Sequence, residues 1–338
     1  MKKLFVLTLF LCLPFFSLLP AARGRLSAPA PGVRILKVMC LPTRPLALTV
    51  AIKQGLFAKY GVEVQAQIAA NSEELRTALA GGTLDLGHAA VDNAVALAEK
   101  ARVNVVVVLG GEGSTNELIA QPSIHSIAEL RGQTVIVDAP TTAYALQLKK
   151  ILLLSGLQAD RDYQIKAVGG TPLRLAAMRE HKEYAASILG PPTSLIAKRE
   201  GFISLGSTQQ FIGPYQGVGA FVRSEWASGN RDLLIAYVAA FVEAQRWILD
   251  PAHKAEVITL LEDEFKLTGA IANEAYDAWI VAPGGLEADA KISLEGFTNV
   301  LRLRAEIEHT WSGEIPAPEK YYDPSYYEAA LLKLSPAR

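Results

Sequence analysis

Beyond residue 32, short apolar runs alternate with longer segments in which apolar residues recur every three or four positions. The first pattern is typical of buried strands and the second of amphipathic helices. The predicted strands are 33–40, 62–67, 83–90, 103–109, 118–120, 134–138, 163–168 and 184–189. The predicted helices are 45–54, 56–60, 71–80, 92–100, 126–132, 141–155, 172–180 and 192–199. This alternation predicts an α/β protein with mostly parallel sheets and right-handed crossovers.

The stretch "AIKQGLFAKYGVEV" shows how the first crossover is kept short. The helix predicted for 45–54 ends at Gly55, one further turn ends at Gly61, and the next strand follows at once. Glycine suits the left-handed conformation that ends a helix. We interpret the two glycines as scaffold. The candidate functional position is the start of the helix, where free backbone N–H groups can bind an anion or a carbonyl oxygen.

The alternation of strands and helices is interrupted at Gly110-Gly111 and then resumes, which predicts two similar lobes. The glycine-rich segment 213–224 is interpreted as the return connection. Helices are predicted after it at 231–249, 252–265, 270–281 and 292–308, and the tail "PAPEKYYDPSYY" is expected to lie along the surface. We therefore expect lobe one to comprise 31–115 and 217–338, and lobe two to comprise 116–216.

The first thirty residues have the pattern of a secretory signal peptide. The cationic start "MKK" precedes the apolar run "LFVLTLFLCLPFFSLLP" and a tail of small residues. A membrane anchor is the alternative, because the run is close to the roughly 17 residues that can span a bilayer. Export to the periplasm with cleavage is the favoured prediction. Ala28-Pro29-Ala30 is the best cleavage signal, and a cut nearer Ala22 is the alternative.

Charge and motifs exclude several classes of function. Without residues 1–30 the chain carries 29 basic and 34 acidic side chains, a net charge of −5, so no nucleic-acid partner is predicted. The remaining cysteine, Cys40, suits a buried apolar role. The five histidines lack zinc-site spacing, and no glycine motif has dinucleotide or P-loop spacing, so no metal, cofactor or catalytic residue is predicted. Distant residues could still meet in such a site, so an enzyme stays an alternative.

Several segments resemble, in order and at similar spacing, the periplasmic solute-binding proteins of ABC importers. They are "AIKQGLFAKYGVEV", "ALAGGTLDLGHAA", "SIHSIAELRGQTVIVD", "LLLSGL" and "YVAAFVEAQRWILDPAHKAEVI". The subgroup that they resemble takes up nitrate, sulfonates, taurine and thiamine-precursor pyrimidines. The resemblance covers nearly the whole chain after the signal peptide.

The resemblance implies a two-lobe periplasmic-binding-protein fold of type II, in which each lobe is a mostly parallel sheet flanked by helices. The two hinge crossings would fall near 110–118 and 213–221, and the C-terminal helices would mostly return to the first lobe. It further implies a small-molecule solute as ligand and an ABC permease with its ATPase as partners, and a monomer is expected.

Pocket candidates follow from the rule that ligands of open parallel sheets bind beyond the carboxyl ends of the strands. The candidates lie in loops after strands, at the helix starts that follow, and in the return connection. They are Thr43, Arg44, Asn71, Ser72, Asp92, Asn93, Thr141, Thr142, Tyr144, Thr171, Pro191, Thr193 and Tyr215. Simpler interpretations exist, since the polar residues can cap helices, Asp92 can complement a helix dipole, and the tyrosines can pack in a core.

The charge of the ligand stays open at this point. Arg44 and the helix starts favour an anion such as a sulfonate, nitrate or a carboxylate, whereas Asp92 favours an amine or a pyrimidine ring. The favoured function is capture of a small anion in the cleft by hinge closure. The alternatives are a pyrimidine-binding protein, a pyrimidine-synthesising enzyme on the same scaffold, and a solute sensor that acts on a receptor.

Overall fold

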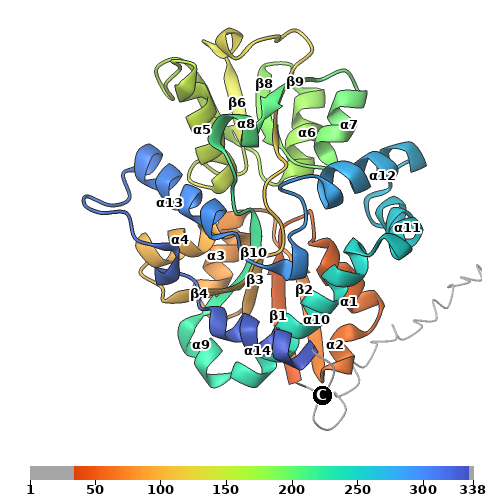
Figure 1. Cartoon of the computed structure of the whole chain (residues 1–338). Helices are drawn as coiled ribbons and strands as arrows, with labels where there is room; N and C mark the ends of the chain where they lie inside the picture. The colour runs from red at the N-terminus through yellow and green to blue at the C-terminus, as the bar shows by residue number, and fades with distance from the viewer. Residues whose placement is uncertain (1–33, 335–338) are drawn as a thin grey trace, which may run out of the picture.

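The computed structural model describes residues 34–334, so the predicted signal peptide, 1–30, lies outside the described residues. Two five-stranded sheets form the centres of two lobes, which Figure 1 shows one above the other. The predicted two-lobe α/β fold class is confirmed. No helix within 34–334 combines the length and the apolar composition that crossing a membrane requires.

The first sheet has the strand order β2-β1-β3-β10-β4. β1 pairs in parallel with β2 and β3, whereas β10 runs antiparallel between β3 and β4. Nearly every position of β3 and β4 is buried, because helices cover both faces of the sheet and the strands are correspondingly apolar. The strands are β1 (Arg34–Cys40), β2 (Val62–Ile68), β3 (Leu86–Ala90), β4 (Val105–Leu109) and β10 (Val218–Arg223).

The second sheet, β7-β6-β8-β5-β9, repeats this arrangement with the antiparallel strand β5 between β8 and β9. Its strands are β5 (Glu117–Ala120), β6 (Thr134–Val137), β7 (Gln164–Ala167), β8 (Tyr184–Leu189) and β9 (Ile203–Ser207). The sequence did not predict β9. All five of its residues are half-buried, and "ISLGS" has only two apolar residues, Ile203 and Leu205, too few for a clear strand pattern.

Two segments carry the chain from one sheet to the other, 110–116 and 208–217. They pass in close contact, because a Cβ on Gly217 would lie 1.8 Å from the carbonyl oxygen of Gly113. The carbonyl oxygen of Glu112 also accepts a hydrogen bond from Gln216 Nε2 at 3.0 Å. The glycines of these crossings therefore permit a close approach of two backbones.

Helices cover both faces of both sheets (Figure 1). Those up to the second crossing are α1 (Leu46–Lys53), α2 (Leu56–Lys59), α3 (Ser72–Ala80), α4 (Asp92–Glu99), η1 (Ile127–Leu130), α5 (Ala143–Leu154), α6 (Thr171–Glu180), α7 (Thr193–Arg199) and α8 (Thr208–Ile212). Those after it are α9 (Ser224–Gly229), α10 (Arg231–Leu249), η2 (Pro251–His253), α11 (Lys254–Phe265), α12 (Gly269–Ala275), η3 (Tyr276–Val281), η4 (Ala288–Ala290), α13 (Leu294–Glu308), η5 (Pro318–Lys320) and α14 (Pro324–Leu334).

The C-terminal helices pack against both lobes. α10 packs against α1 and α14 on the first sheet, while α13 packs against α5 and α12 against α7 of the second lobe. Figure 1 shows α13 and α12 on opposite sides of the junction. The expected surface tail is only partly exposed, because Tyr321, Tyr326 and Tyr327 are buried in the cores of the first lobe. Their rings pack as apolar surface despite the polar hydroxyl.

Candidate functional site

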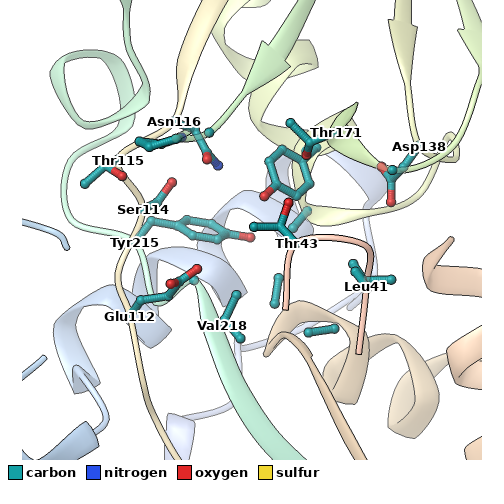
Figure 2. Close-up of a pocket in the computed structure, with 18 of the residues that line it drawn as sticks. Leu41, Thr43, Glu112, Ser114, Thr115, Asn116, Asp138, Thr171, Tyr215 and Val218 are labelled. Carbon is teal, nitrogen blue, oxygen red and sulfur yellow. The ribbon is translucent and has the colours of Figure 1, made fainter. Parts of the chain in front are cut away.

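A pocket lies between the two lobes, where strands of both sheets end (Figure 2). It encloses about 70 Å³, and since one water needs roughly 10–15 Å³ of such space, the pocket suits a small solute. The first lobe supplies the turn after β1, the start of α3 and the end of β3. The second lobe supplies the loops after β6 and β8 and the starts of α5 and α6. The two crossing segments and Trp279 complete the wall.

Part of the predicted set lines this pocket. These residues are Thr43, Asn71, Tyr144, Thr171, Pro191 and Tyr215. Asn71 is also a helix cap, because its Oδ1 accepts the backbone N–H groups of Glu73 and Glu74. Tyr215 is buried, and among the residues that the structure describes its hydroxyl has no hydrogen-bond partner.

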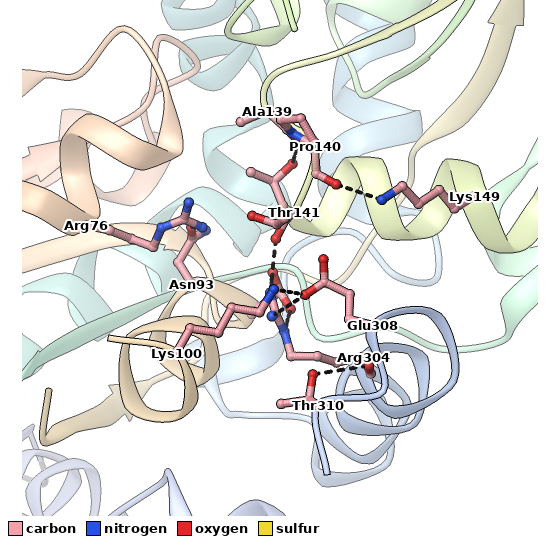
Figure 3. A network of polar contacts seen from close by, with 12 residues as sticks. Arg76, Asn93, Lys100, Ala139, Pro140, Thr141, Lys149, Arg304, Glu308 and Thr310 are labelled. Atoms are coloured by element: carbon pink, nitrogen blue, oxygen red, sulfur yellow. Dashed lines mark hydrogen bonds and ion pairs between the residues drawn. The ribbon is translucent and has the colours of Figure 1, made fainter. Parts of the chain in front are cut away.

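Asp92 and Asn93 were predicted to face the ligand but do not line the pocket. Asp92 is fully buried and forms an ion pair with Arg304 of α13, at 2.7 Å from Nε to Oδ1. Asn93 accepts from Arg76 Nη1 at 3.2 Å and donates to the Ala90 carbonyl oxygen at 3.1 Å. Figure 3 shows Arg304 at the centre of this network, between Glu308 and Thr141. Both predicted side chains are therefore engaged within the protein.

Ser72 and Thr142 also lie outside the pocket lining, because both side chains donate hydrogen bonds to Asp138. Ser72 Oγ donates to Asp138 Oδ2 at 2.9 Å, and Thr142 Oγ1 donates to Asp138 Oδ1. Ser72 begins α3 of the first lobe, whereas Asp138 follows β6 of the second. Their bond therefore joins the two lobes beside the pocket.

The three remaining predicted residues, Arg44, Thr141 and Thr193, do not line the pocket either. Arg44 is half-buried in the turn after β1. Its charge acts on the Cys40 thiol, whose pKa burial nevertheless raises to about 11. The carbonyl oxygen of Thr141 accepts from Arg304 Nη2 at 3.1 Å. Thr193 is buried at the first position of α7.

Arg174 is a pocket residue that the sequence analysis missed. Its guanidinium donates to Ser187 Oγ, to Thr171 Oγ1 and to the carbonyl oxygens of Gly169 and Ile188, at 2.7 to 3.1 Å. It also lies 5.0 Å from the centre of the Tyr144 ring. Burial lowers the pKa of Arg174 below its usual value, although the charge of Asp138 opposes this. The pocket wall thus contains a buried cation with no ion-pair partner among residues 34–334.

Glu112 is a second residue that was missed, in the first crossing segment. Its Oε2 accepts from Trp279 Nε1 at 2.9 Å, and Figure 2 shows its carboxylate beside the Tyr215 ring. Burial raises the pKa of Glu112 to about 7, and the hydrogen bond from Trp279 opposes this only in part. The segment around Glu112 was predicted only as a hinge crossing, so its acidic side chain was not among the predicted site residues.

Other polar groups that line the pocket are Asp138, His88, Ser114, Asn116 and Gln147. The rule that placed candidates after strands could have identified Asp138, which directly follows β6. His88 lies inside β3, where burial lowers its pKa to about 3 and keeps the ring neutral. Ser114 and Asn116 precede an antiparallel strand, a position that the rule does not cover.

Together, the repeated sheet order, the two crossings and the inter-lobe pocket define a two-lobe binding-protein fold. The chain belongs to the NMT1-like family, whose sequence profile it matches over residues 38–262. A Brucella abortus relative, "Putative binding protein BAB2_1146", is 25% identical over 198 residues, which is 58% of this chain and 60% of the relative. The chain therefore covers less than two thirds of that relative's length.

Solved structures share the fold at low sequence identity. The periplasmic nitrate-binding protein of Synechocystis PCC 6803 is 15% identical with a TM-score of 0.73, over 91% of this chain and 90% of its own. The alkanesulfonate-binding protein of Xanthomonas axonopodis pv. citri, bound to MOPS, is 14% identical with a TM-score of 0.70, over 88% and 100%. A desulfurization enzyme is 14% identical with a TM-score of 0.60, over 89% and 99%. The resemblance to periplasmic solute-binding proteins is thus confirmed for the fold, and the family that the sequence shows is the NMT1-like family.

Proposed function

We propose that this protein is the exported solute-binding component of an ABC importer, which captures a small solute with an anionic group between its lobes. A membrane permease and its ATPase would receive the solute. The observation that carries this proposal is a pocket built from both lobes whose wall contains the buried guanidinium of Arg174, which has no ion-pair partner among residues 34–334. The nitrate- and alkanesulfonate-binding proteins that share the fold support the same class of ligand.

The local backbone also favours an anion at the second lobe. α5 and α6 both begin at the pocket, with twelve and ten residues. The first N–H groups of a helix have no partner within the helix, and they carry partial positive charge. The hydroxyl of Tyr215, which has no hydrogen-bond partner among residues 34–334, is a further polar group that a ligand can satisfy.

We further propose that 31–115 with 217–338 and 116–216 move as lobes about the two crossings. The bond between Ser72 and Asp138 and the one between Arg304 and Thr141 both join the lobes, which supports the proposal that this arrangement is the closed form. A ligand favours closure only if it binds the closed form more tightly than the open one. The signal peptide, its cleavage, the periplasmic location and a monomeric state belong to this proposal.

A thermal-shift screen of small sulfonates, phosphonates, carboxylates, nitrate and pyrimidines tests the proposal. A true ligand at a hundredfold excess over its dissociation constant should stabilise the protein by about 2.7 kcal/mol. Small-angle scattering should then show a smaller radius of gyration with the ligand bound. A bound solute that leaves the radius unchanged, or a screen without any hit, would contradict it.

An enzyme on the same scaffold is the second candidate, because a desulfurization enzyme shares the fold. Mass spectrometry of each screen hit after prolonged incubation with the protein separates the two functions. Unchanged solute supports binding alone, and conversion of the solute supports an enzyme.

A further inference from the structure

The loop 138–142 of the second lobe is bonded to the first lobe near both of its ends. Ser72 Oγ, at the start of α3, donates to Asp138 Oδ2 at 2.9 Å. Arg304 Nη2, in α13, donates to the Thr141 carbonyl oxygen at 3.1 Å (Figure 3). The loop follows β6 and leads into α5, and its Asp138 lines the pocket. Two separate elements of the first lobe therefore hold one loop of the pocket wall.

Both donors are fixed on the first lobe by other bonds. Ser72 is the first residue of α3, and the side chain of Asn71 caps the start of that helix. Arg304 donates to both carboxylate oxygens of Asp92 and, through Nη1, to Glu308. Because the donors are already in place, the loop can bind to them with only a small loss of side-chain freedom.

The Asp138 carboxylate accepts a hydrogen bond from each lobe. Its Oδ1 accepts from Thr142 Oγ1 of its own lobe, and its Oδ2 accepts from Ser72. Asp138 and Ser72 are only 5% and 2% exposed, so water has little access to the bond between them. A hydrogen bond to a carboxylate stabilises more than one between two neutral groups. Separation of the lobes would break this bond, and the bond therefore favours the closed arrangement.

Apolar contacts join the lobes beside the same loop. Leu146 of α5 is buried in one hydrophobic cluster with Phe297 and Val300 of α13. On the outer side of this contact, Glu306 of α13 forms an ion pair with Lys150 of α5. Apolar burial stabilises the contact without direction, whereas the two hydrogen bonds to the loop fix its position. The closed arrangement is thus supported by contacts that the protein makes with itself.

We propose that Ser72 and Arg304 are positioning residues that hold the lobes closed through the loop 138–142, so that the ligand-free protein populates the closed form alongside an open one. The inference rests on the proposed movement of the lobes and goes beyond it, because closure then does not require a solute. Neither side chain lines the pocket. The two residues act on every solute alike, because the apparent dissociation constant rises as the fraction of binding-competent protein falls.

Pulsed electron paramagnetic resonance on the ligand-free chain without its signal peptide tests this inference. Spin labels at Thr77→Cys in α3 and Glu180→Cys in α6 place one exposed label on each lobe, and the buried Cys40 stays unlabelled. With Ser72 and Arg304 intact, the labels should show a short and a long distance. Ser72→Ala should lower the ratio of the short to the long population by about threefold to tenfold, the factor expected for the loss of one hydrogen bond.

Arg304→Lys should shift the ratio in the same direction. Lysine keeps a cation beside Asp92, but it lacks the planar fork of donors that reaches Asp92 and Thr141 together. Ser126→Ala is the matched control. Ser126 Oγ donates to Glu129 Oε1 at 2.9 Å within the second lobe, so this variant loses the same type of bond and should keep the ratio unchanged.

The distance between the lobes is a readout that a purely structural role would not change, and thermal unfolding of each variant measures such a role separately. A Ser72→Ala protein with unchanged distances, or a natural protein that shows only the long distance, would overturn the inference. An unchanged ratio in Arg304→Lys would overturn the role of Arg304, and Ser72→Ala still decides if Arg304→Lys does not fold. These results concern the ligand-free protein and leave the capture of a solute standing. Failure of every screened solute to bind would instead overturn the proposed function.

Discussion

Arg304 donates to both carboxylate oxygens of Asp92, at 2.7 Å from Nε and 2.9 Å from Nη2, with both side chains fully buried. Asp92 begins α4, and Arg304 lies in α13. Burial alone would lower the pKa of Arg304, but Asp92 and Glu308 raise it above its usual value. The same guanidinium reaches the Thr141 carbonyl oxygen of the second lobe (Figure 3). One guanidinium thus holds a C-terminal helix against both lobes, by an ion pair to Asp92 and a hydrogen bond to Thr141.

The substitution Arg304→Met should strongly destabilise the protein, because it leaves Asp92 buried without its cation. Removal of one partner from a buried ion pair typically costs about 3–5 kcal/mol of the free energy of unfolding. Urea denaturation measures this loss. Arg302→Met is the matched control, since Arg302 is exposed on the same helix, and it should change stability by no more than about 0.5 kcal/mol. A loss below about 1 kcal/mol for Arg304→Met would contradict the role of this pair.

The arrangement of strands and helices could be predicted because it follows from local patterns. The apolar run "VVVVL" is a strand buried on both faces, and the glycines at 55 and 61 separate short elements as expected. β9 and the buried tyrosines of the tail escaped prediction, because their environment depends on contacts with segments distant in sequence. Local patterns specify elements, and only the packed chain specifies which surfaces they share.

The same limit explains the candidate site. The rule about strand ends correctly indicated the loops around the pocket, but it cannot tell which way a side chain points. Asp92 and Ser72 lie at the helix starts that follow such loops, yet Arg304, more than two hundred residues away, neutralises Asp92, and Asp138 accepts from Ser72. Glu112 and Arg174 are the converse case. Their importance depends on missing ion-pair partners, which no sequence pattern records.

The titration of Glu112 should make the stability of the ligand-free protein depend on pH. Its pKa is raised from 4.5 to about 7, so between these values the folded protein binds more protons than the unfolded chain. The free energy of unfolding should therefore fall as the pH rises through this window. Glu112→Gln lacks this loss and should be more stable than the natural protein at pH 8 by about 1–3 kcal/mol.

Thermal unfolding at several pH values checks this difference, which should vanish near pH 4, where Glu112 is protonated in both states. Glu314→Gln is the control and should follow the natural protein at every pH. A Glu112→Gln protein that gains nothing at high pH would mean that the carboxylate is stabilised in the folded state.

Gly217→Ala should disrupt the contact between the two crossing segments. An added Cβ would lie 1.8 Å from the Gly113 carbonyl oxygen, so one backbone must move. Overpacking of this kind typically costs about 1–3 kcal/mol, and the displaced Glu112 and Tyr215 should weaken ligand binding as well. Calorimetry of unfolding and of binding measures both effects. Gly229→Ala is the control, because its Cβ would meet nothing within 4 Å, and it should alter neither quantity. Unchanged stability in Gly217→Ala would show that the crossings separate easily.

Tyr215→Phe should separate ligand binding from stability. The Tyr215 hydroxyl is buried without a partner in the described part of the chain, so its removal should leave the ligand-free protein as stable as before or slightly more stable. If the ligand bonds to this hydroxyl, its dissociation constant should rise roughly threefold to tenfold. Tyr60→Phe should behave in the opposite way. Tyr60 Oη donates to Glu243 Oε2 at 2.7 Å outside the pocket, so this control should lose about 1 kcal/mol of stability and keep its affinity. If Tyr215→Phe instead lost stability and kept its affinity, the hydroxyl would have its partner within the protein and none in the ligand.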